Sequence, residues 1–255
     1  MEPAWFDSHC HLFDCDGSGV EVIERARAAG VRELLVAGTD LVSSERALGL
    51  AEHEGVYAAA GIHPNECATW RPSDMGPIEE LLSDARVVAV GESGLDFYRD
   101  SAPEGRQREA FEAHIELSKE HDKALIIHTR ASVDAAIDLL AAAGAPARVV
   151  FHCWSGDRRR LERALDLGAF ISFAGNVTFA KNDALRALAG VVPEDRLLIE
   201  TDSPYLTPVP HRGTPNQPSN VRLVGETVAR ARATTDAAIA RLTGANARRL
   251  FALDP

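Results

Sequence analysis

The chain has 255 residues, of which 45% are hydrophobic and 25% charged, and its formal net charge is -11. This composition is typical of a globular protein and excludes a chain that is mainly disordered. The acidic charge argues against a broad basic face that binds nucleic-acid backbones non-specifically. It still allows a local site that handles phosphate through metal ions.

Targeting signals and disulfides are not evident in the sequence. The first six residues, Met1 to Phe6, lack the cationic and apolar regions of a secretory signal. No charge-free apolar run approaches the roughly 18 residues of a membrane span. The four cysteines form no C-x-x-C pair; they are Cys10, Cys15, Cys67 and Cys153. We therefore expect a cytoplasmic protein with reduced thiols, no membrane association and no stable protein partner.

One pattern recurs along the whole chain, a short apolar run followed by an amphipathic stretch. Runs such as Val87 to Val90 are almost continuously apolar, which is typical of parallel strands covered on both faces. The eight runs are Trp5 to Leu12, Arg32 to Gly38, Val56 to Ile62, Arg86 to Gly91, Ala124 to Thr129, Arg148 to Cys153, Ala169 to Phe173 and Arg196 to Thr201.

The stretches between these runs have helical spacing, with apolar residues at i, i+3, i+4 and i+7 from Val133 to Leu140. Eight such units without a linker predict a single-domain α/β protein, a (β/α)8 TIM barrel over residues 1–255. A doubly wound open sheet is the alternative. The tail from Asp236 to Phe251 is expected to add two short helices to the outer ring.

Ionisable residues occur at the ends of the predicted strands, where barrel enzymes carry their catalytic side chains. Because strand side chains alternate, His9 and His11 point the same way and Cys10 points toward the helices. Two imidazoles on one face can hold one metal ion, although an isolated H-x-H is about as easily explained by hydrogen-bonded histidines. Asp7, on the same face, is expected to support one of these imidazoles.

Four further strand ends contribute to the same mouth. Glu92 directly follows an apolar strand and a glycine, and Glu200 lies deep enough to need a cationic partner or a proton. The six candidate metal ligands are His9, His11, Glu92, His128, His152 and Asp202. Six ligands exceed what one ion normally takes and favour two ions bridged by a carboxylate.

These strand ends resemble the motifs of the TatD-related deoxyribonuclease family, a branch of the amidohydrolase superfamily of TIM barrels. The matching segments are Phe6 to Leu12, Gly61 to Pro64, Gly91 to Phe97, Ile127 to Arg130, His152 to Gly156, Glu200 to Pro204, Arg212 to Asn216 and Asn246 to Phe251. Two positions depart from the family pattern: Asn65 stands where a second histidine is usual, and Ser93 where an apolar residue is usual.

The resemblance implies that His9 and His11 hold one ion and that His128 and His152 hold the other. It further implies that Glu92 bridges them, and that Asp202 binds the first ion and handles the proton of the attacking water. The catalytic residues are thus expected to be Asp202 and Glu92.

The expected activity is a metal-dependent 3'-5' exonuclease that acts on DNA ends or single-stranded DNA. His63, Arg130 and Arg212 are expected to contact substrate phosphates, with loop stabilisation or ion pairing as the alternative for each. The two divalent ions are expected to be zinc, magnesium or manganese. The alternatives are a hydrolase of aminoacyl-tRNA or of small esters and amides at the same centre, and a non-catalytic metal-binding protein.

Overall fold

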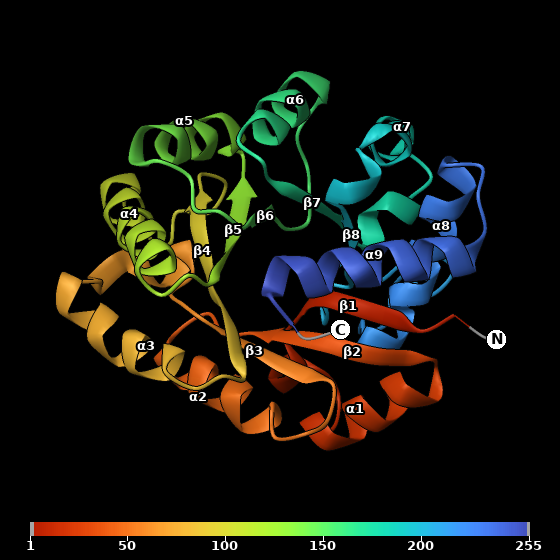
Figure 1. Cartoon of the computed structure of the whole chain (residues 1–255), viewed down its shortest axis with the longest axis horizontal. Coiled ribbons are helices and arrows are strands. Elements are labelled where there is room, and N and C mark those ends of the chain that lie inside the picture. The colour runs from red at the N-terminus through yellow and green to blue at the C-terminus, as the bar shows by residue number, and fades with distance from the viewer. Residues whose placement is uncertain (1–2, 254–255) are drawn as a thin grey trace.

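The computed structural model describes residues 3–253 and arranges them as a ring of parallel strands inside a ring of helices (Figure 1). The strands are β1 (Trp5–Cys10), β2 (Val31–Ala37), β3 (Val56–Ala60), β4 (Val87–Asp96), β5 (Ala124–Arg130), β6 (Val149–Phe151), β7 (Phe170–Phe173) and β8 (Leu197–Ile199). Within these residues all eight form one sheet in chain order. This confirms the barrel and excludes the doubly wound sheet. The first two and last two residues of the predicted domain 1–255 lie outside the described residues.

Helices follow the strands in turn and cover the outside of the sheet (Figure 1). They are α1 (Gly19–Ala28), α2 (Leu41–Leu50), α3 (Met75–Leu82), α4 (Glu104–Glu120), α5 (Val133–Ala143), α6 (Arg158–Asp166), α7 (Asp183–Val191), α8 (Val221–Ala231) and α9 (Asp236–Phe251). Short 3-10 turns are η1 (Leu12–Asp14), η2 (Pro64–Thr69), η3 (Pro72–Asp74), η4 (Gly175–Thr178), η5 (Glu194–Arg196) and η6 (Pro218–Asn220).

The seam between β1 and β8 closes at the end of the barrel where the strands end, which we call the mouth. The backbone N–H of Asp202 donates to the carbonyl of His9 (3.0 Å), and that of His11 donates to the carbonyl of Ser203 (2.8 Å). The Ser8 hydroxyl donates to the carbonyl of Ile199 deeper in the seam (3.0 Å). These bonds fix the segment after β8 beside the end of β1.

The opposite end of the barrel is closed by α9, which crosses in front of the strands in Figure 1. Its residues Ala247, Leu250 and Phe251 belong to one buried cluster with inward-facing side chains such as Phe6 and Leu198. The prediction of two short helices in the outer ring was wrong. The glycine at 244 costs a helix only about 1 kcal/mol, and burial of the apolar side chains on both sides of it outweighs that cost.

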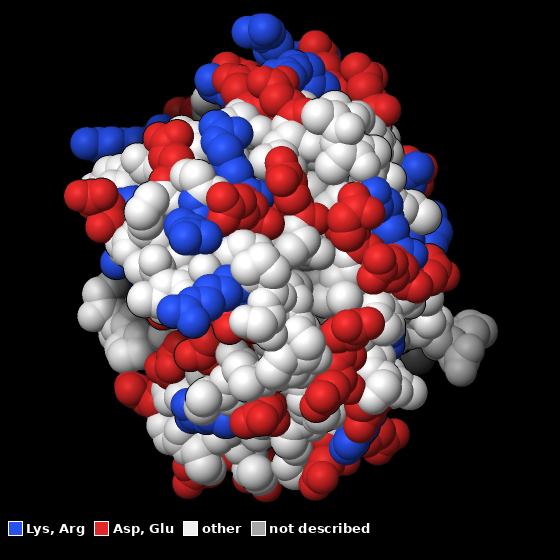
Figure 2. All heavy atoms as spheres, turned by 90° about the vertical axis from the view of Figure 1, so that its left-hand side faces the viewer, with Lys and Arg blue, Asp and Glu red and all other residues white. Residues whose placement is uncertain are grey.

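The surface matches the acidic composition. On the side that carries α3 and α4, acidic and basic side chains intermingle without a continuous basic stripe (Figure 2). Nowhere in residues 3–253 does a helix combine the length and apolar character that a bilayer crossing requires. All four cysteines lie in this part of the chain and are free.

A buried imidazole in α4 links this helix to the end of β3. His114 accepts a hydrogen bond at Nε2 from the backbone N–H of Ile62 (2.9 Å) and donates from Nδ1 to the carbonyl of Ala110 (2.7 Å). Because both ring nitrogens are engaged in this way, the ring is neutral. Burial lowers the pKa of His114 from 6.5 to about 4.

We expect His114 to weaken the fold on acidification. Between pH 6.5 and 4 the unfolded chain binds a proton at this position that the folded chain does not, so stability falls as the pH falls through this window. The shift corresponds to roughly 3 kcal/mol. In urea titrations from pH 7.5 to 4, His114→Gln should lose stability less steeply than the wild type. Parallel curves for the two proteins would contradict this assignment.

Candidate metal centre

At the mouth, a carboxylate from β4 lies next to two imidazoles from the end of β1. His9 lies in β1 and His11 just after it, and their Nε2 atoms are 3.3 Å apart. Glu92, in β4, places Oε2 3.2 Å from His9 Nε2 and 3.4 Å from His11 Nε2. The alternation predicted for His9, Cys10 and His11 is confirmed, because Cys10 is buried among the outer core residues. We call His9 and His11 the first group.

The other oxygen of Glu92 faces a different set of imidazoles. Oε1 lies 2.7 Å from His128 Nδ1 and 2.9 Å from His152 Nε2. His128 comes from β5 and His152 directly follows β6. We call His128 and His152 the second group. A single carboxylate therefore spans two groups of nitrogen donors, one for each of its oxygens.

Asp202 approaches the first group from the segment after β8. Its Oδ1 lies 3.7 Å from His11 Nε2 and 4.0 Å from His9 Nε2. The residue has a left-handed φ of 54°, a conformation that non-glycine residues seldom adopt unless their surroundings hold it. Here the seam bond to His9 and a hydrogen bond from the N–H of Tyr205 to the Asp202 carbonyl (2.8 Å) hold it.

Hydrogen bonds on the far side of two of the rings leave the nitrogens that face Glu92 free to bind a cation, and a third ring faces a carboxylate. His11 Nδ1 donates to the carbonyl of Ala37 (2.9 Å). His152 Nδ1 donates to Glu200 (3.1 Å), which confirms that Glu200 needs a cationic or proton-donating partner. His128 turns Nε2 toward Asp96 (3.4 Å). Oxygen partners of this kind are typical of histidines that ligate metals.

His63 has the opposite arrangement. The backbone N–H of Asn65 donates to His63 Nδ1 (3.0 Å), so the neutral ring carries its proton on Nε2. That nitrogen lies 3.4 Å from Glu92 Oε1. In this tautomer His63 is a hydrogen-bond donor at the mouth, although its Nε2 also belongs to a set of possible metal donors with Glu92 and His128. Its predicted contact with substrate phosphate remains a prediction.

Two supporting roles differ from the sequence analysis. Asp7 was expected to support an imidazole, and this is wrong. Its carboxylate instead accepts hydrogen bonds from the N–H (2.8 Å) and hydroxyl (2.5 Å) of Thr201. Asp96 was missed, although it lies in the same motif as Glu92 at the end of β4. The Asn65 side chain donates to Asp96 (3.3 Å), so one of the two departures from the family pattern supports the carboxylate that faces His128.

The two arginines predicted to contact substrate are both exposed, in loops and strand ends beside the site. The Arg130 guanidinium lies 3.9 Å from the centroid of the Tyr98 ring, and that of Arg212 lies 3.9 Å from the centroid of Phe179. Arg212 also donates a hydrogen bond to the carbonyl of Thr207 (3.2 Å). Their role toward phosphates stays a prediction.

The chain matches a known protein family over almost its whole length. The family model described as "TatD related DNase" matches residues 6–252. The chain belongs to this family. The TatD-family chain is 38% identical to the uncharacterized metal-dependent hydrolase YabD of Bacillus subtilis (strain 168), and the match covers 98% of this chain and 99% of YabD.

Two further relatives show the same correspondence. The 3'-5' ssDNA/RNA exonuclease TatD of Klebsiella pneumoniae (strain 342) is 36% identical, with 92% of each chain covered. The crystal structure of YjjV, a TatD homologue of Escherichia coli K12, superposes with a TM-score of 0.93 at 30% identity, covering 100% of both chains. The chain is therefore a TatD-family metal-dependent hydrolase with the fold of that family.

The donor atoms of the first group suit a divalent ion. Two ligand atoms held 2.0–2.1 Å from a tetrahedral ion are about 3.4 Å apart. The distances among His9 Nε2, His11 Nε2 and Glu92 Oε2 are 3.2 to 3.4 Å. Residues 3–253 contain three overlapping sets of three donors whose atoms lie within 4.8 Å of one another, and Glu92 belongs to two of them. The residues of this TatD-family site therefore fit metal ions.

Charges within the site are mutually stabilised. Burial alone raises the pKa of a carboxyl group, but the neighbouring histidines outweigh it and hold the pKa of Glu92 well below its usual range. Burial likewise disfavours a charged His152, yet Glu92 and Glu200 raise its pKa. Cations must displace protons from such imidazoles, so metal binding is expected to release protons and to tighten as the pH rises.

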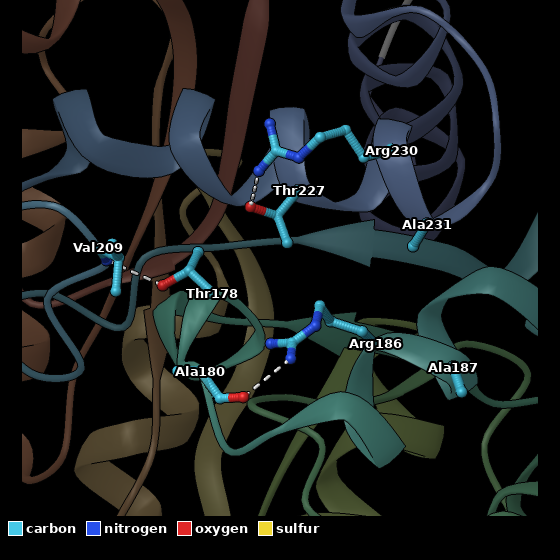
Figure 3. A pocket seen from close by; sticks show the side chains of 8 residues that line it. All are labelled: Thr178, Ala180, Arg186, Ala187, Val209, Thr227, Arg230 and Ala231. Carbon is cyan, nitrogen blue, oxygen red and sulfur yellow. Dashed lines mark hydrogen bonds between the residues drawn. The ribbon is translucent and has the colours of Figure 1, made fainter.

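A separate hollow lies beside the mouth and contains none of these ligands. It has a volume of about 570 Å³ and is lined by residues of η4, α7, α8 and the loop after β8 (Figure 3). Its ionisable groups are Arg186 and Arg230, and Arg186 donates to the carbonyl of Ala180. Because arginine does not exchange its proton at working pH, this hollow cannot carry out acid–base chemistry.

Glu92 is positioned by a close approach of two backbones. A Cβ on Gly61 would lie 2.5 Å from Gly91 Cα and 2.7 Å from the Gly91 carbonyl carbon. Gly91 directly precedes Glu92, so a side chain at position 61 must push β4 away from β3.

We expect Gly61→Ala to reduce the free energy of unfolding by about 1–3 kcal/mol, the usual cost of overpacking, and to weaken metal binding. Denaturant titration and metal analysis would measure both. The matched control is Gly49→Ala in α2, where a Cβ meets nothing within 4 Å. It should stabilise the protein by about 0.5–1 kcal/mol. Equal effects of the two substitutions would refute the close-approach argument.

Proposed function

We propose that this protein is a metal-dependent phosphodiesterase that removes nucleotides from the 3' end of single-stranded DNA or RNA. The observation that carries the proposal is that the two carboxylate oxygens of Glu92 face different groups. Oε2 faces the first group and Oε1 faces the second. A bridging carboxylate between two donor groups suits a pair of ions that stabilise the attacking and leaving oxygens of a phosphoryl group. The Klebsiella pneumoniae relative, named a 3'-5' ssDNA/RNA exonuclease, supports the choice of substrate.

In this proposal the first group and Asp202 would hold one divalent ion, the second group would hold the other, and Glu92 would contribute an oxygen to each. Bound ions supply an acidified water and neutralise the charge of the phosphate. Four imidazoles favour zinc, manganese or nickel over magnesium, which prefers oxygen ligands.

The protein's own groups handle the protons and the substrate. Asp202 would accept a proton from the attacking water and return it to the leaving oxygen as the phosphodiester bond breaks. Its Oδ1 lies 3.7 Å from His11 Nε2, and the nearby imidazoles lower its pKa against the effect of burial, so the carboxylate is ionised and able to accept that proton. His63 donates its Nε2 proton in a hydrogen bond to a phosphate oxygen. Arg130 and Arg212 place guanidinium groups at the mouth, where they can pair with the phosphates that follow. The four free cysteines are consistent with action in the cytoplasm.

The experiment compares three substrate classes with metal-loaded protein. These are 3'-labelled single-stranded DNA, mischarged tRNA and a panel of small esters and amides. Stepwise loss of 3' nucleotides supports the proposal, and chelated protein serves as the inactive control. Turnover of only the small substrates, or deacylation of tRNA without loss of nucleotides, would replace it with the corresponding hydrolase. No turnover with bound metal would point to a metal-binding protein.

A further inference from the structure

Two exposed aromatic side chains follow strands that contribute to the metal centre. Among residues 3–253 the large hydrophobic side chains that are exposed are Val20, Val42, Tyr98, Val191, Tyr205 and Val209. Only two of these are aromatic: Tyr98 is 69% exposed and Tyr205 is 56% exposed. Both closely follow a strand that contributes to the metal centre.

Tyr205 lies beside the first group. Its ring centroid is 6.2 Å from that of His11, and the two ring planes meet at 69°. The N–H of Tyr205 donates to the carbonyl of Asp202, and the Asn216 side chain donates to the carbonyl of Tyr205 (2.6 Å). The backbone of this residue is thus fixed at the metal centre while more than half of its side chain faces solvent.

Tyr98 lies beside the second group. Its N–H donates to Asp96 Oδ1 (2.9 Å), and the other oxygen of Asp96 faces His128. The Arg130 guanidinium covers one face of the ring at 3.9 Å. Tyr98 as a residue is 69% exposed, so the ring face that Arg130 does not cover is available to a ligand. The arginine holds the ring in place by a cation–π contact and adds positive charge.

We propose that Tyr205 and Tyr98 are stacking platforms for the two nucleobases that flank the scissile phosphate. This inference rests on the proposed function, because it assumes a nucleic-acid strand with its phosphate at Glu92. The Tyr205 ring lies next to the first group, and the Tyr98 backbone is bound to the carboxylate that faces the second group, so we place one ring on each side of a strand whose phosphate is held between the groups. Proteins that bind single strands combine positive charge with aromatic rings on which bases stack.

The charge of the chain makes these rings important. At a net charge of -11 the protein cannot rely on a long basic groove for affinity. Stacking is nearly independent of sequence, since every base has an aromatic face. Tyr205 and Tyr98 would therefore bind the end of a strand with little dependence on its sequence. They would favour single strands, because the bases of a duplex are already paired and stacked on one another.

The experiment measures binding and cleavage separately. Binding of a fluorescent single-stranded oligonucleotide is measured on chelated protein, and 3'-nucleotide release on metal-loaded protein, for the wild type, Tyr98→Ala, Tyr205→Ala and the ring-preserving Tyr98→Phe and Tyr205→Phe. Each alanine variant should lose about tenfold in affinity and in kcat/KM through KM. The phenylalanine variants should stay within about twofold of the wild type, because the stacking face is kept. Val191→Ala, at the end of α7, is the control for an exposed apolar side chain outside the mouth.

A substrate without bases at its last two positions completes the test. The wild type should bind and cleave it about tenfold less well, and the alanine variants should show no further loss. If the wild type cleaves DNA and the alanine variants match it, the stacking inference is overturned and the proposed function stands. If binding depends on the tyrosines but no nucleotides are released, the proposed function fails, and only the stacking of bases on these rings stands, without a scissile phosphate between them. Neither binding nor cleavage would overturn both.

Discussion

Replacement of Glu92 by Gln is expected to abolish hydrolysis and to reduce the metal content from two divalent ions to one or none. The carboxylate lies within 3.4 Å of a nitrogen on each of five imidazoles; they belong to His9, His11, His63, His128 and His152. An amide of the same shape presents an N–H₂ group to one of the two groups of ligands, and that group repels a cation. The loss of rate should exceed about 10³-fold, more than a single electrostatic contact supplies.

Metal analysis by mass spectrometry and single-turnover hydrolysis would measure the two effects of Glu92→Gln. The matched control is Glu33→Gln, the same change at the opposite end of the barrel, where the carboxylate pairs with Arg248. It should keep both ions and full activity. Two tightly bound ions in folded Glu92→Gln would refute the bridging role.

The meeting of the six candidate ligands could be predicted from the sequence because two simple rules apply to them. Parallel strands end at the same edge, so ionisable residues at their ends must meet at the mouth. Alternation then separates His9 and His11 from Cys10. Both rules depend on local sequence alone, and the structure places His9, His11, Glu92, His128, His152 and Asp202 together as they require.

The hydrogen bonds that orient these ligands could not be predicted in the same way. Asp96 meets His128 because β4 continues to position 96 and pairs with β5 up to Arg130. The strand was expected to end at Gly91. The proton on His63 is placed by the backbone N–H of Asn65, a contact of the 3-10 turn after β3. Asp7 was misassigned because the barrel seam brings Thr201 against it, and sequence spacing carries no information about that contact.

Asp202→Asn should separate proton transfer from metal binding, which Glu92→Gln cannot do because it is expected to lower both the rate and the metal content. The amide keeps an oxygen that can approach the first group, but it cannot accept a proton. Because positioned acids and bases contribute about 10²–10⁴-fold to rate, we expect a loss of this size in kcat, with metal still bound. Single-turnover hydrolysis of 3'-labelled DNA and metal analysis on the same sample would test it. The control is Asp166→Asn at the exposed end of α6, which should leave both unchanged.

The pH dependence distinguishes a base from a ligand at this position. The pKa of Asp202 is lowered despite its burial, because His11 and the neighbouring imidazoles stabilise its carboxylate. The wild-type base is therefore ionised throughout the neutral range, and acid should inactivate the enzyme chiefly by releasing the metal from the imidazoles. Asp202→Asn should then show the same acidic limb as the wild type but a lower plateau that alkaline pH does not restore, because an amide has no proton to lose there. If hydrolysis survives at full rate with metal bound, the attacking water loses its proton to another group and Asp202 is not the base.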